Sequence, residues 1–565
     1  MADLVFRGAT VVDGTGADRY RADVAVTDGV ISDIATRAGR LADADRVIDA
    51  DGLVVAPGFI DMHAHSDLRT LVEREHPSRV TQGITSEVLG QDGLSYAPVD
   101  DTTLPALRSQ IAGWNGDPED FAWDWRTVGE YLDRLDRGMA VNACYLVPHG
   151  TVRMLAMGWE NREPTGAELD RMRELVAQGM REGAVGLSSG LSYPPGMYAG
   201  TDELVELCSV VAAHGGYHSP HQRSYGAGAL SGYAEMIEIS RRSGCPLHLA
   251  HATMNFGVNA GRAAEFLALI DAAIAEGCDI SLDTYPYLPG STTLAALLPS
   301  WSAEGGPEAT LARLADPAAR ERIRRDVEEN GSDGNSGMVI DWRTIEICAV
   351  ANPTDLADPT GLADASDALD LADASDVRAP DRAEQLIGRT VAQIAQTRGV
   401  TGTEAFLDLL VSDRLGTTIL HHVGNEENVR AIMRHPAHTV GSDGLLIGAR
   451  PHPRAWGTFP RYLGHYGRDL RVLTLEEAVE RMTGRPARRL RLERRGLVRA
   501  GYHADLVAFD PATVRDAATF AEPRRPAVGM HEVLVNGVAV LTGGRPTGAL
   551  PGRALRRTET GVSAL

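Results

Sequence analysis

The chain contains no lysine, so all 55 of its basic residues are arginine. Biased nucleotide composition is the simplest cause, but the absence also restricts the chemistry. Lysine is the side chain that forms Schiff bases and that acts as a general base when burial lowers its pKa. Neither role is open to this protein, and neither is a carbamylated lysine that bridges two metal ions.

Cysteines and long apolar segments are also scarce. The five cysteines are odd in number and include no close pair, which predicts reduced thiols in a cytoplasmic protein rather than a disulfide framework. No apolar run approaches the roughly 18 residues that span a bilayer. The first residues lack a basic region followed by an apolar one. We therefore expect neither a membrane partner nor export by a signal peptide.

The charge balance is acidic, with 77 acidic and 55 basic residues and a formal net charge of −22. Such a charge argues against nucleic acid as a partner and favours solubility. The hydrophobic content of 43% and charged content of 23% describe a globular protein able to bury a large core. At 565 residues, the chain is long enough for a barrel of about 250 residues or more and a second domain.

The chain divides into three zones by residue pattern. Residues 1–57 carry short apolar runs between Gly and Asp turns, such as 4–6, 10–12, 23–26 and 29–31, and similar runs return in 486–565. Residues 58–485 alternate strand-like runs with helical stretches: 143–147 before 167–182, 185–187 before 202–214, and 247–250 before 260–276. About eight such units close into a barrel. The sequence predicts an α/β protein, with a distorted (β/α)8 TIM-like barrel and a small β-sandwich domain built from both chain ends.

Two segments of the predicted barrel read as insertions. Residues 301–336 combine helical patterning with a glycine-rich loop, which suits a flap over the site. Residues 352–381 contain the near-repeat Leu-Ala-Asp-Ala-Ser-Asp, at 362–367 and 371–376. Because this segment is acidic and poor in large apolar side chains, we expect a surface loop without a catalytic role.

Metal-binding chemistry is indicated first by residues 58–67, Gly-Phe-Ile-Asp-Met-His-Ala-His-Ser-Asp. Side chains alternate along a strand, so Asp61, His63 and His65 would share one face. Two imidazoles two residues apart can then reach the same metal ion. Taken alone, this His-x-His pair is a weak signal, because many such histidines are surface or hydrogen-bonded core residues.

Further polar residues follow other predicted strands: Asp92, His221, His251 and Asp443. Taken alone, each of His221, His251 and Asp92 is most simply a capping or hydrogen-bonded polar residue. Together with His63 and His65, they supply nitrogen and oxygen ligands at corresponding places in one barrel. Their joint occurrence predicts a metal centre.

Longer motifs give the chain a family resemblance. Besides Pro-Gly-Phe-Ile-Asp-x-His-x-His, they are residues 186–196 (Gly-Leu-Ser-Ser-Gly-Leu-Ser-Tyr-Pro-Pro-Gly), 283–287 (Asp-Thr-Tyr-Pro-Tyr), 451–459 (Pro-His-Pro-Arg-Ala-Trp-Gly-Thr-Phe) and 547–553 (Thr-Gly-Ala-Leu-Pro-Gly-Arg). The chain resembles the amidohydrolase superfamily and, over nearly its whole length, the N-acyl-D-amino-acid deacylases within it. The resemblance implies metal-dependent hydrolysis of N-acyl-D-amino acids to a carboxylate and a free D-amino acid.

The resemblance also implies roles for single residues. It places zinc on His221 and His251, with His63 and His65 at a second, weaker position, and makes Asp443 the catalytic carboxylate and a metal ligand. Tyr285, Ser291 and Arg454 would hold the substrate carboxylate, and a guanidinium fork suits that ligand. The deacylases have Gly-Asn-Cys-Gly where this chain has Gly90-Gln91-Asp92-Gly93. Because a carboxylate is a harder ligand than a thiolate, one or two zinc ions, or another divalent metal, remain alternatives.

The missing lysine supports the deacylase branch, because hydantoinase-like members of the superfamily bridge two metals with a carbamylated lysine. Two alternatives stay open. One is another amidohydrolase that cleaves a cyclic amide, a dipeptide or a different acylated amine. The other is a non-enzymatic scaffold, which would be expected to have lost metal ligands. The oligomeric state is open as well.

Overall fold

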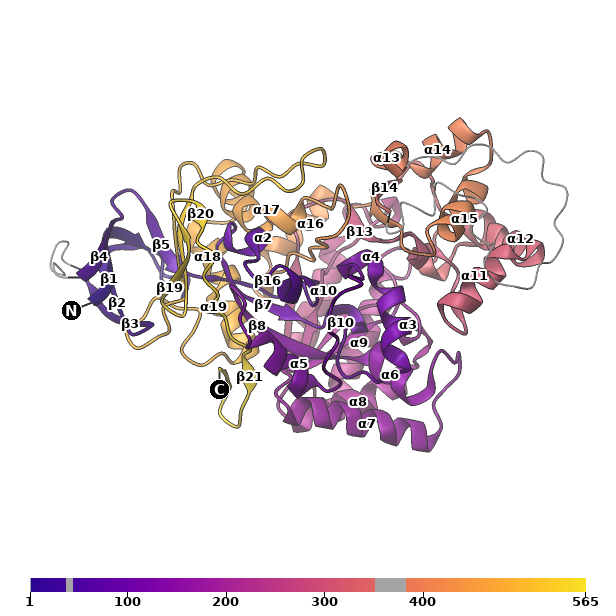
Figure 1. Cartoon of the computed structure of the whole chain (residues 1–565), viewed down its shortest axis with the longest axis horizontal. Helices are drawn as coiled ribbons and strands as arrows, with labels where there is room; N and C mark the ends of the chain where they lie inside the picture. Colours follow the sequence, from indigo (N-terminus) through magenta and orange to yellow (C-terminus); the bar gives the residue numbers. More distant parts are fainter. Residues whose placement is uncertain (1, 37–43, 351–382, 565) are drawn as a thin grey trace.

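The computed structural model describes residues 2–36, 44–350 and 383–564 (Figure 1). The predicted loop at 352–381 lies outside the described residues. The larger part of the chain forms a barrel-like α/β unit, and both chain ends meet in a separate β-sheet. Among the helices of the described ranges, none is both long and apolar enough to cross a membrane.

Eight parallel strands form the barrel. In spatial order they are β16 (His438–Val440), β12 (Ile280–Thr284), β11 (Leu247–Leu249), β10 (Tyr217–His221), β9 (Gly186–Gly190), β8 (Asn142–Pro148), β7 (Ile84–Leu89) and β6 (Phe59–Asp61). A backbone hydrogen bond of 3.1 Å from Met62 N to Val440 O joins the two outer strands. Nearly all of these strand residues are buried, as expected for a parallel sheet covered on both faces. The predicted barrel is confirmed.

Helices cover the barrel, and they include the three stretches for which the sequence predicted helices (Figure 1). They include α5 (Val128–Leu135), α6 (His149–Met157), α7 (Gly166–Arg181), α8 (Thr201–Ala213), α9 (Ala229–Ser243), α10 (Ala263–Ala275), α16 (Glu426–Arg434), α17 (Arg454–Arg461), α18 (Leu475–Met482) and α19 (Gly484–Leu490). A capping box starts α7: Thr165 Oγ1 accepts from Glu168 N, and Glu168 Oε2 accepts from Thr165 N. Such reciprocal bonds satisfy the free N–H groups of a first turn. The apolar faces of α5 to α10 pack in one large core, whereas α17, α18 and α19 contribute to two further apolar clusters.

The second sheet has nine strands drawn from both chain ends. They are β1 (Ala2–Val11), β2 (Tyr20–Thr27), β3 (Val30–Ala35), β4 (Ala44–Asp49), β5 (Val54–Pro57), β17 (Leu506–Phe509), β18 (Met530–Val535), β19 (Val538–Thr542) and β20 (Arg545–Pro546). Strand β5 joins the two ends, because it pairs with β1 on one side and with β17 on the other. The division of the chain at residues 57 and 485 stays a prediction.

One local difference from the sequence pattern concerns β1. Residues 4–6 and 10–12 read as two strands separated by a turn at Gly8. The structure instead has one strand with a register shift between Phe6 and Ala9. Gly8 has a φ of 68°, which glycine adopts without strain, and its N–H donates to Asp23 Oδ1 at 2.7 Å. The glycine therefore makes a bulge rather than a turn.

The predicted flap segment 301–336 belongs to a larger unit with its own apolar core. This unit lies at one end of the molecule in Figure 1 and contains a three-stranded sheet and several helices. Its elements include β13 (Gly290–Thr293), α11 (Pro307–Ala315), α12 (Pro317–Arg325), β14 (Ile345–Ala349), α14 (Val391–Arg398), α15 (Gly402–Ser412) and β15 (Thr418–His421).

A buried ion cluster fixes β7 to the short helix α2 (Pro77–Val80). Glu87 accepts from Arg79 Nε at 3.0 Å and from Ser66 Oγ at 2.6 Å, and its other oxygen lies 3.3 Å from His76 Nε2. Burial raises the pKa of Glu87, but His76 and Arg79 outweigh burial and lower it to about 2. The ionised cluster therefore stabilises the folded state at neutral pH.

We predict that Glu87→Gln lowers the free energy of unfolding at pH 7 by about 3 kcal/mol, because it leaves Arg79 buried without its carboxylate. A pKa lowered from 4.5 to about 2 corresponds to a similar energy. That stabilisation is present above the unfolded pKa of 4.5 and is lost as the pH falls towards 2. Urea unfolding midpoints at several pH values measure both effects, with exposed Glu75→Gln as the control. Equal midpoints for the two variants would contradict the prediction.

Candidate metal centre

Six predicted ligands lie at the carboxyl ends of barrel strands, where barrel enzymes carry their active sites. They are His63 and His65 after β6, Asp92 after β7, His221 at the end of β10, His251 after β11 and Asp443 after β16. The strand β6 ends at Asp61, so the His-x-His pair lies just beyond it rather than within it. All six side chains are nearly or fully buried.

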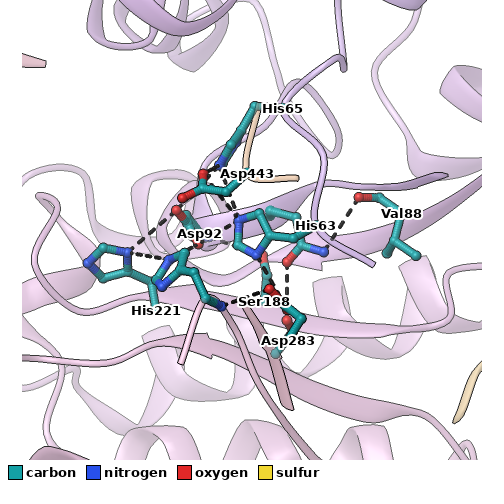
Figure 2. Close-up of polar contacts among 12 residues, drawn as sticks. His63, His65, Val88, Asp92, Ser188, His221, Asp283 and Asp443 are labelled. Atoms are coloured by element: carbon teal, nitrogen blue, oxygen red, sulfur yellow. Dashed lines mark hydrogen bonds and ion pairs between the residues drawn. The ribbon is translucent and has the colours of Figure 1, made fainter. Parts of the chain in front are cut away.

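The six side chains form two groups that share Asp92 (Figure 2). Position A consists of Asp92, His221 and His251, and position B of His63, His65, Asp92 and Asp443. The Nε2 atoms of His63 and His65 lie 3.2 Å apart, and His221 Nδ1 lies 3.0 Å from His251 Nε2. Asp92 lies between the pairs. Its Oδ1 is 3.5 Å from His63 and 3.4 Å from His251, and its Oδ2 is 3.4 Å from His65 and 3.5 Å from His221.

The backbone around the cluster is strained. Asp92, His251 and Asp443 have φ values of 54°, 30° and 49°, in the left-handed region that non-glycine residues rarely adopt. Such conformations persist where the surrounding structure holds them, and they gather at functional sites. Close packing adds a further constraint, because a Cβ on Gly441 would lie 2.5 Å from Asp283 Oδ1 and 2.7 Å from His63 Cβ. These features fix the predicted ligands in place.

The electrostatics of the cluster suit a divalent cation. Burial lowers the pKa of His63 to about 4, which leaves a neutral imidazole able to ligate a metal. Burial also acts to lower the pKa of His65, but the carboxylates of Asp443 and Asp92 outweigh it and raise the pKa to about 10. The carboxylates thus stabilise positive charge at position B. Asp92 Oδ1 is buried and accepts no hydrogen bond from the described residues. Four imidazoles and two carboxylates are a donor set that fits zinc.

Three residues that the sequence analysis did not assign orient these ligands. Ser192 Oγ lies 2.6 Å from His221 Nε2, and Tyr225 OH lies 3.0 Å from His251 Nδ1. Asp283 accepts from the backbone N–H of His251 at 3.0 Å, and its Oδ2 is 3.9 Å from His63 Nδ1. Such partners fix the ring orientation of metal-binding histidines. Ser192 and Asp283 belong to the family motifs 186–196 and 283–287, so the sequence could have indicated both. No motif marked Tyr225.

A chain of buried polar groups continues from Asp283 through the barrel. His248 Nε2 lies 2.9 Å from Asp283 Oδ2, and His248 Nδ1 lies 2.7 Å from Ser281 Oγ. Arg489 Nε, on helix α19, donates to the same Ser281 oxygen at 2.7 Å. The chain connects the metal-ligand end of the barrel to its other end.

The three residues expected to hold the substrate carboxylate lie beside Asp443. Arg454 Nη1 is 2.9 Å from Asp443 Oδ2, its Nη2 donates to the backbone oxygen of Ser291 at 3.2 Å, and its guanidinium lies 4.4 Å from the ring centroid of Tyr285. Burial raises the pKa of Asp443, but Arg454 and His65 outweigh burial and hold the pKa below its usual range. Arg454 itself is fully buried. In this structure the guanidinium of Arg454 therefore pairs with the carboxylate of Asp443.

A cavity of about 120 Å³ opens onto the cluster. Ligands from both positions form its floor, and the polar residues Tyr285 and Ser291 are part of its wall. Residues 334–336, at the end of the predicted flap segment, also reach the wall. The remaining wall is largely apolar and aromatic, with Trp114, Tyr193, Phe256, Leu297, Val423 and Leu445. This is the arrangement of a small-molecule site over a metal centre.

Comparison with known proteins agrees with this geometry, since a model described as the amidohydrolase family matches residues 46–541. The chain belongs to the amidohydrolase family. This amidohydrolase is 34% identical to the D-aminoacylase of Alcaligenes xylosoxydans xylosoxydans, over 98% of both chains. It is 35% identical to the N-acyl-D-glutamate deacylase of the same organism, over 98% of this chain and 96% of that one.

A solved structure supports the same grouping. The N-acyl-D-glutamate deacylase from Bordetella bronchiseptica, complexed with zinc and a phosphonate inhibitor, is similar with a TM-score of 0.79 and 33% identity. The match covers 98% of this chain and all of that one. The resemblance to the N-acyl-D-amino-acid deacylases is confirmed, and this amidohydrolase is an enzyme of that group.

We predict that Asp92→Ala weakens zinc binding at both positions, because both use this carboxylate. Removing a residue that only hydrogen-bonds to a metal ligand lowers metal affinity by roughly 10- to 100-fold. Removing a ligand that both positions share should lower the affinity at least as much. Competition with a chromophoric chelator measures the zinc affinity. Asp92→Cys is the matched control, since a thiolate replaces the ligand and should retain zinc. Full zinc retention by Asp92→Ala would contradict the shared role.

Proposed function

We propose that this amidohydrolase hydrolyses the amide bond of N-acyl-D-amino acids with the help of zinc, releasing a carboxylate and a free D-amino acid. One observation carries the proposal: a buried histidine and aspartate cluster forms the floor of a cavity. The full-length likeness to deacylases identifies the reaction for which such a cluster is used.

The residues of positions A and B would hold the metal. His221, His251 and Asp92 would bind one ion, and His63, His65 and Asp443 would complete a second position with the same Asp92. When bound, zinc lowers the pKa of a water ligand to about 7 and polarises a carbonyl. The remaining work belongs to the side chains of the protein.

Asp443 is the proposed general base and acid. Its Oδ1 lies at position B, 3.2 Å from His65, and its pKa is held below the usual range, so it is ionised at neutral pH. We propose that it removes a proton from the attacking water and then delivers that proton to the leaving amine nitrogen. An amine leaves from the tetrahedral carbon only after it has been protonated, so one carboxylate can serve both steps.

Arg454 would bind the substrate carboxylate together with Tyr285 and Ser291. Because its guanidinium lies against Asp443 Oδ2, a bound substrate carboxylate would share the same donor. Sharing would weaken the hold of Arg454 on Asp443 and raise the pKa of that base. Substrate binding would thus make Asp443 a stronger base for the attacking water. The fork would also set which enantiomer presents its acyl group to the metal centre.

The five cysteines are free thiols, four of them buried. This state supports the proposed cytoplasmic location, where thiols remain reduced. Cell fractionation with antibody detection would test the location.

The cavity wall predicts a preference among side chains. Among the described residues that line it, none is lysine or arginine, and Arg454, beside Asp443, is assigned to the α-carboxylate. The wall away from the floor combines apolar and aromatic side chains with small uncharged polar ones and His421. Burial of an unpaired carboxylate against such a wall is costly. We therefore expect turnover of N-acetyl-D-leucine and N-acetyl-D-phenylalanine, with kcat/KM at least about tenfold lower for N-acetyl-D-glutamate. Assays of the zinc-loaded enzyme on both enantiomers test this; no activity on any D-substrate would refute the proposed function.

We predict that Asp443→Asn abolishes turnover, at least about 100-fold in kcat, while zinc stays bound at position A. The amide keeps the shape of the carboxylate but cannot accept the proton. Metal analysis and single-turnover assays on the same preparation separate loss of chemistry from loss of metal. Activity near that of the wild type would exclude the proposed role.

Arg454→Gln serves as the contrasting variant in that experiment. It keeps the carboxylate of Asp443 but removes the fork, so the main expected effect is a higher KM for N-acyl-D-amino acids. A variant that loses only kcat would instead indicate that Arg454 acts through Asp443 alone.

A further inference from the structure

A second cavity, of about 380 Å³, lies at the opposite end of the barrel from the metal centre. Its wall includes residues near the starts of strands, among them Tyr217, Ser281 and Thr439, whereas the metal ligands follow strand ends. Helix α19 and the strand β21 (Arg556–Arg557) complete the wall. No residue of positions A or B takes part in it.

Arginines dominate this second cavity. Five of them line it, together with two carboxylates: Arg485, Arg488, Arg489, Arg491, Arg557, Glu480 and Asp279. Both carboxylates are already paired. Glu480 accepts from Arg485 at 2.9 Å and Arg488 at 2.8 Å, and Asp279 accepts from Arg489 at 2.6 Å. The lining therefore carries a surplus of positive charge in a protein with a net charge of −22.

Arg491 and Arg557 are the two lining arginines whose positive charge is not balanced by a carboxylate of the described chain. Within the described ranges, neither forms an ion pair with a carboxylate. Both present an Nη1 atom within 3.6 Å of the point that a Cβ on Gly215 would occupy, so the two guanidinium groups converge. Arg557 Nη2 donates to Val185 O at 3.2 Å, and its Nε is buried without a partner among the described residues. Two like charges close together repel each other, and an anion between them would offset that repulsion.

We infer that this second cavity binds a phosphate group, either free or on a small phosphomonoester. Guanidinium forks match the oxygens of phosphate, and several uncompensated charges suit a dianion better than a monocarboxylate. The cavity is larger than an inorganic ion requires, which leaves room for an organic part. The site is independent of the reaction at the metal centre.

Isothermal titration of the zinc-loaded enzyme with inorganic phosphate, in a buffer low in chloride, tests the inference. Arg491→Gln and Arg557→Gln should each weaken binding by roughly tenfold, because each removes a charge-assisted contact. Arg545→Gln, at an exposed position on β20, is the matched control and should bind as the wild type does. A parallel titration with glycerol 3-phosphate distinguishes the source: tighter binding indicates a phosphomonoester, and tighter binding of inorganic phosphate indicates the free ion.

Two outcomes would overturn the inference. One is no binding of either probe to the wild type. The other is equal affinity in the wild type and both arginine variants, which would place the phosphate elsewhere, for example at the metal centre. Circular dichroism and an unchanged kcat on the preferred substrate check that the variants are folded. Arg491 is exposed, so its substitution keeps the test valid even if Arg557→Gln does not fold.

Discussion

The metal centre depends on the closure of the parallel barrel, because closure joins residues that are far apart in the sequence. His63 follows the first barrel strand and Asp443 the last, yet Asp443 N donates to His63 O at 2.8 Å. This bond and the bond from Met62 to Val440 fix the two outer strands side by side. Once the register is set, the alternation of side chains leaves few positions from which a residue can reach the centre of the mouth. The six predicted ligands occupy those positions.

Asp92 is the residue that the two candidate metal positions share, and its environment is costly without a cation. Three cluster residues adopt left-handed backbone conformations, each at roughly 1–3 kcal/mol. Buried imidazoles and carboxylates also lose their hydration. Zinc binding to protein sites supplies on the order of 10 kcal/mol, which is enough to offset these terms. Asp92 lies at nearly equal distances from the four histidines, and each of its oxygens is near one histidine of either position, so this carboxylate could serve both.

The sequence predicted the barrel and placed six ligand candidates at one end of it. This was possible because the alternation of side chains along a strand, and the succession of strands and helices, can be read directly along the chain. It did not predict the contacts between side chains of different strands. Tyr225 reaches His251 from a loop after β10, and no motif marks that residue. The pairing of Arg454 with Asp443 depends on how α17 packs over the barrel mouth. Similarly, the sequence around Gly8 is compatible with a turn or a bulge, and only the contact with Asp23 on the partner strand distinguishes them.

The buried polar chain from Asp283 to Arg489 limits how the arginines at the far end of the barrel can be interpreted. Arg489 completes that chain through Ser281, and Arg485 donates to backbone oxygens of Pro436 and His438, so both have structural work within the fold. Arginines with such partners stabilise the closed end of a barrel. Arg491 and Arg557 fit this account less well: Arg557 donates to Val185 O, but neither arginine pairs with a carboxylate among the described residues, and each lies near the other. An anion that binds from outside would offset the repulsion between the two guanidinium groups, which is the role that we infer for a phosphate group.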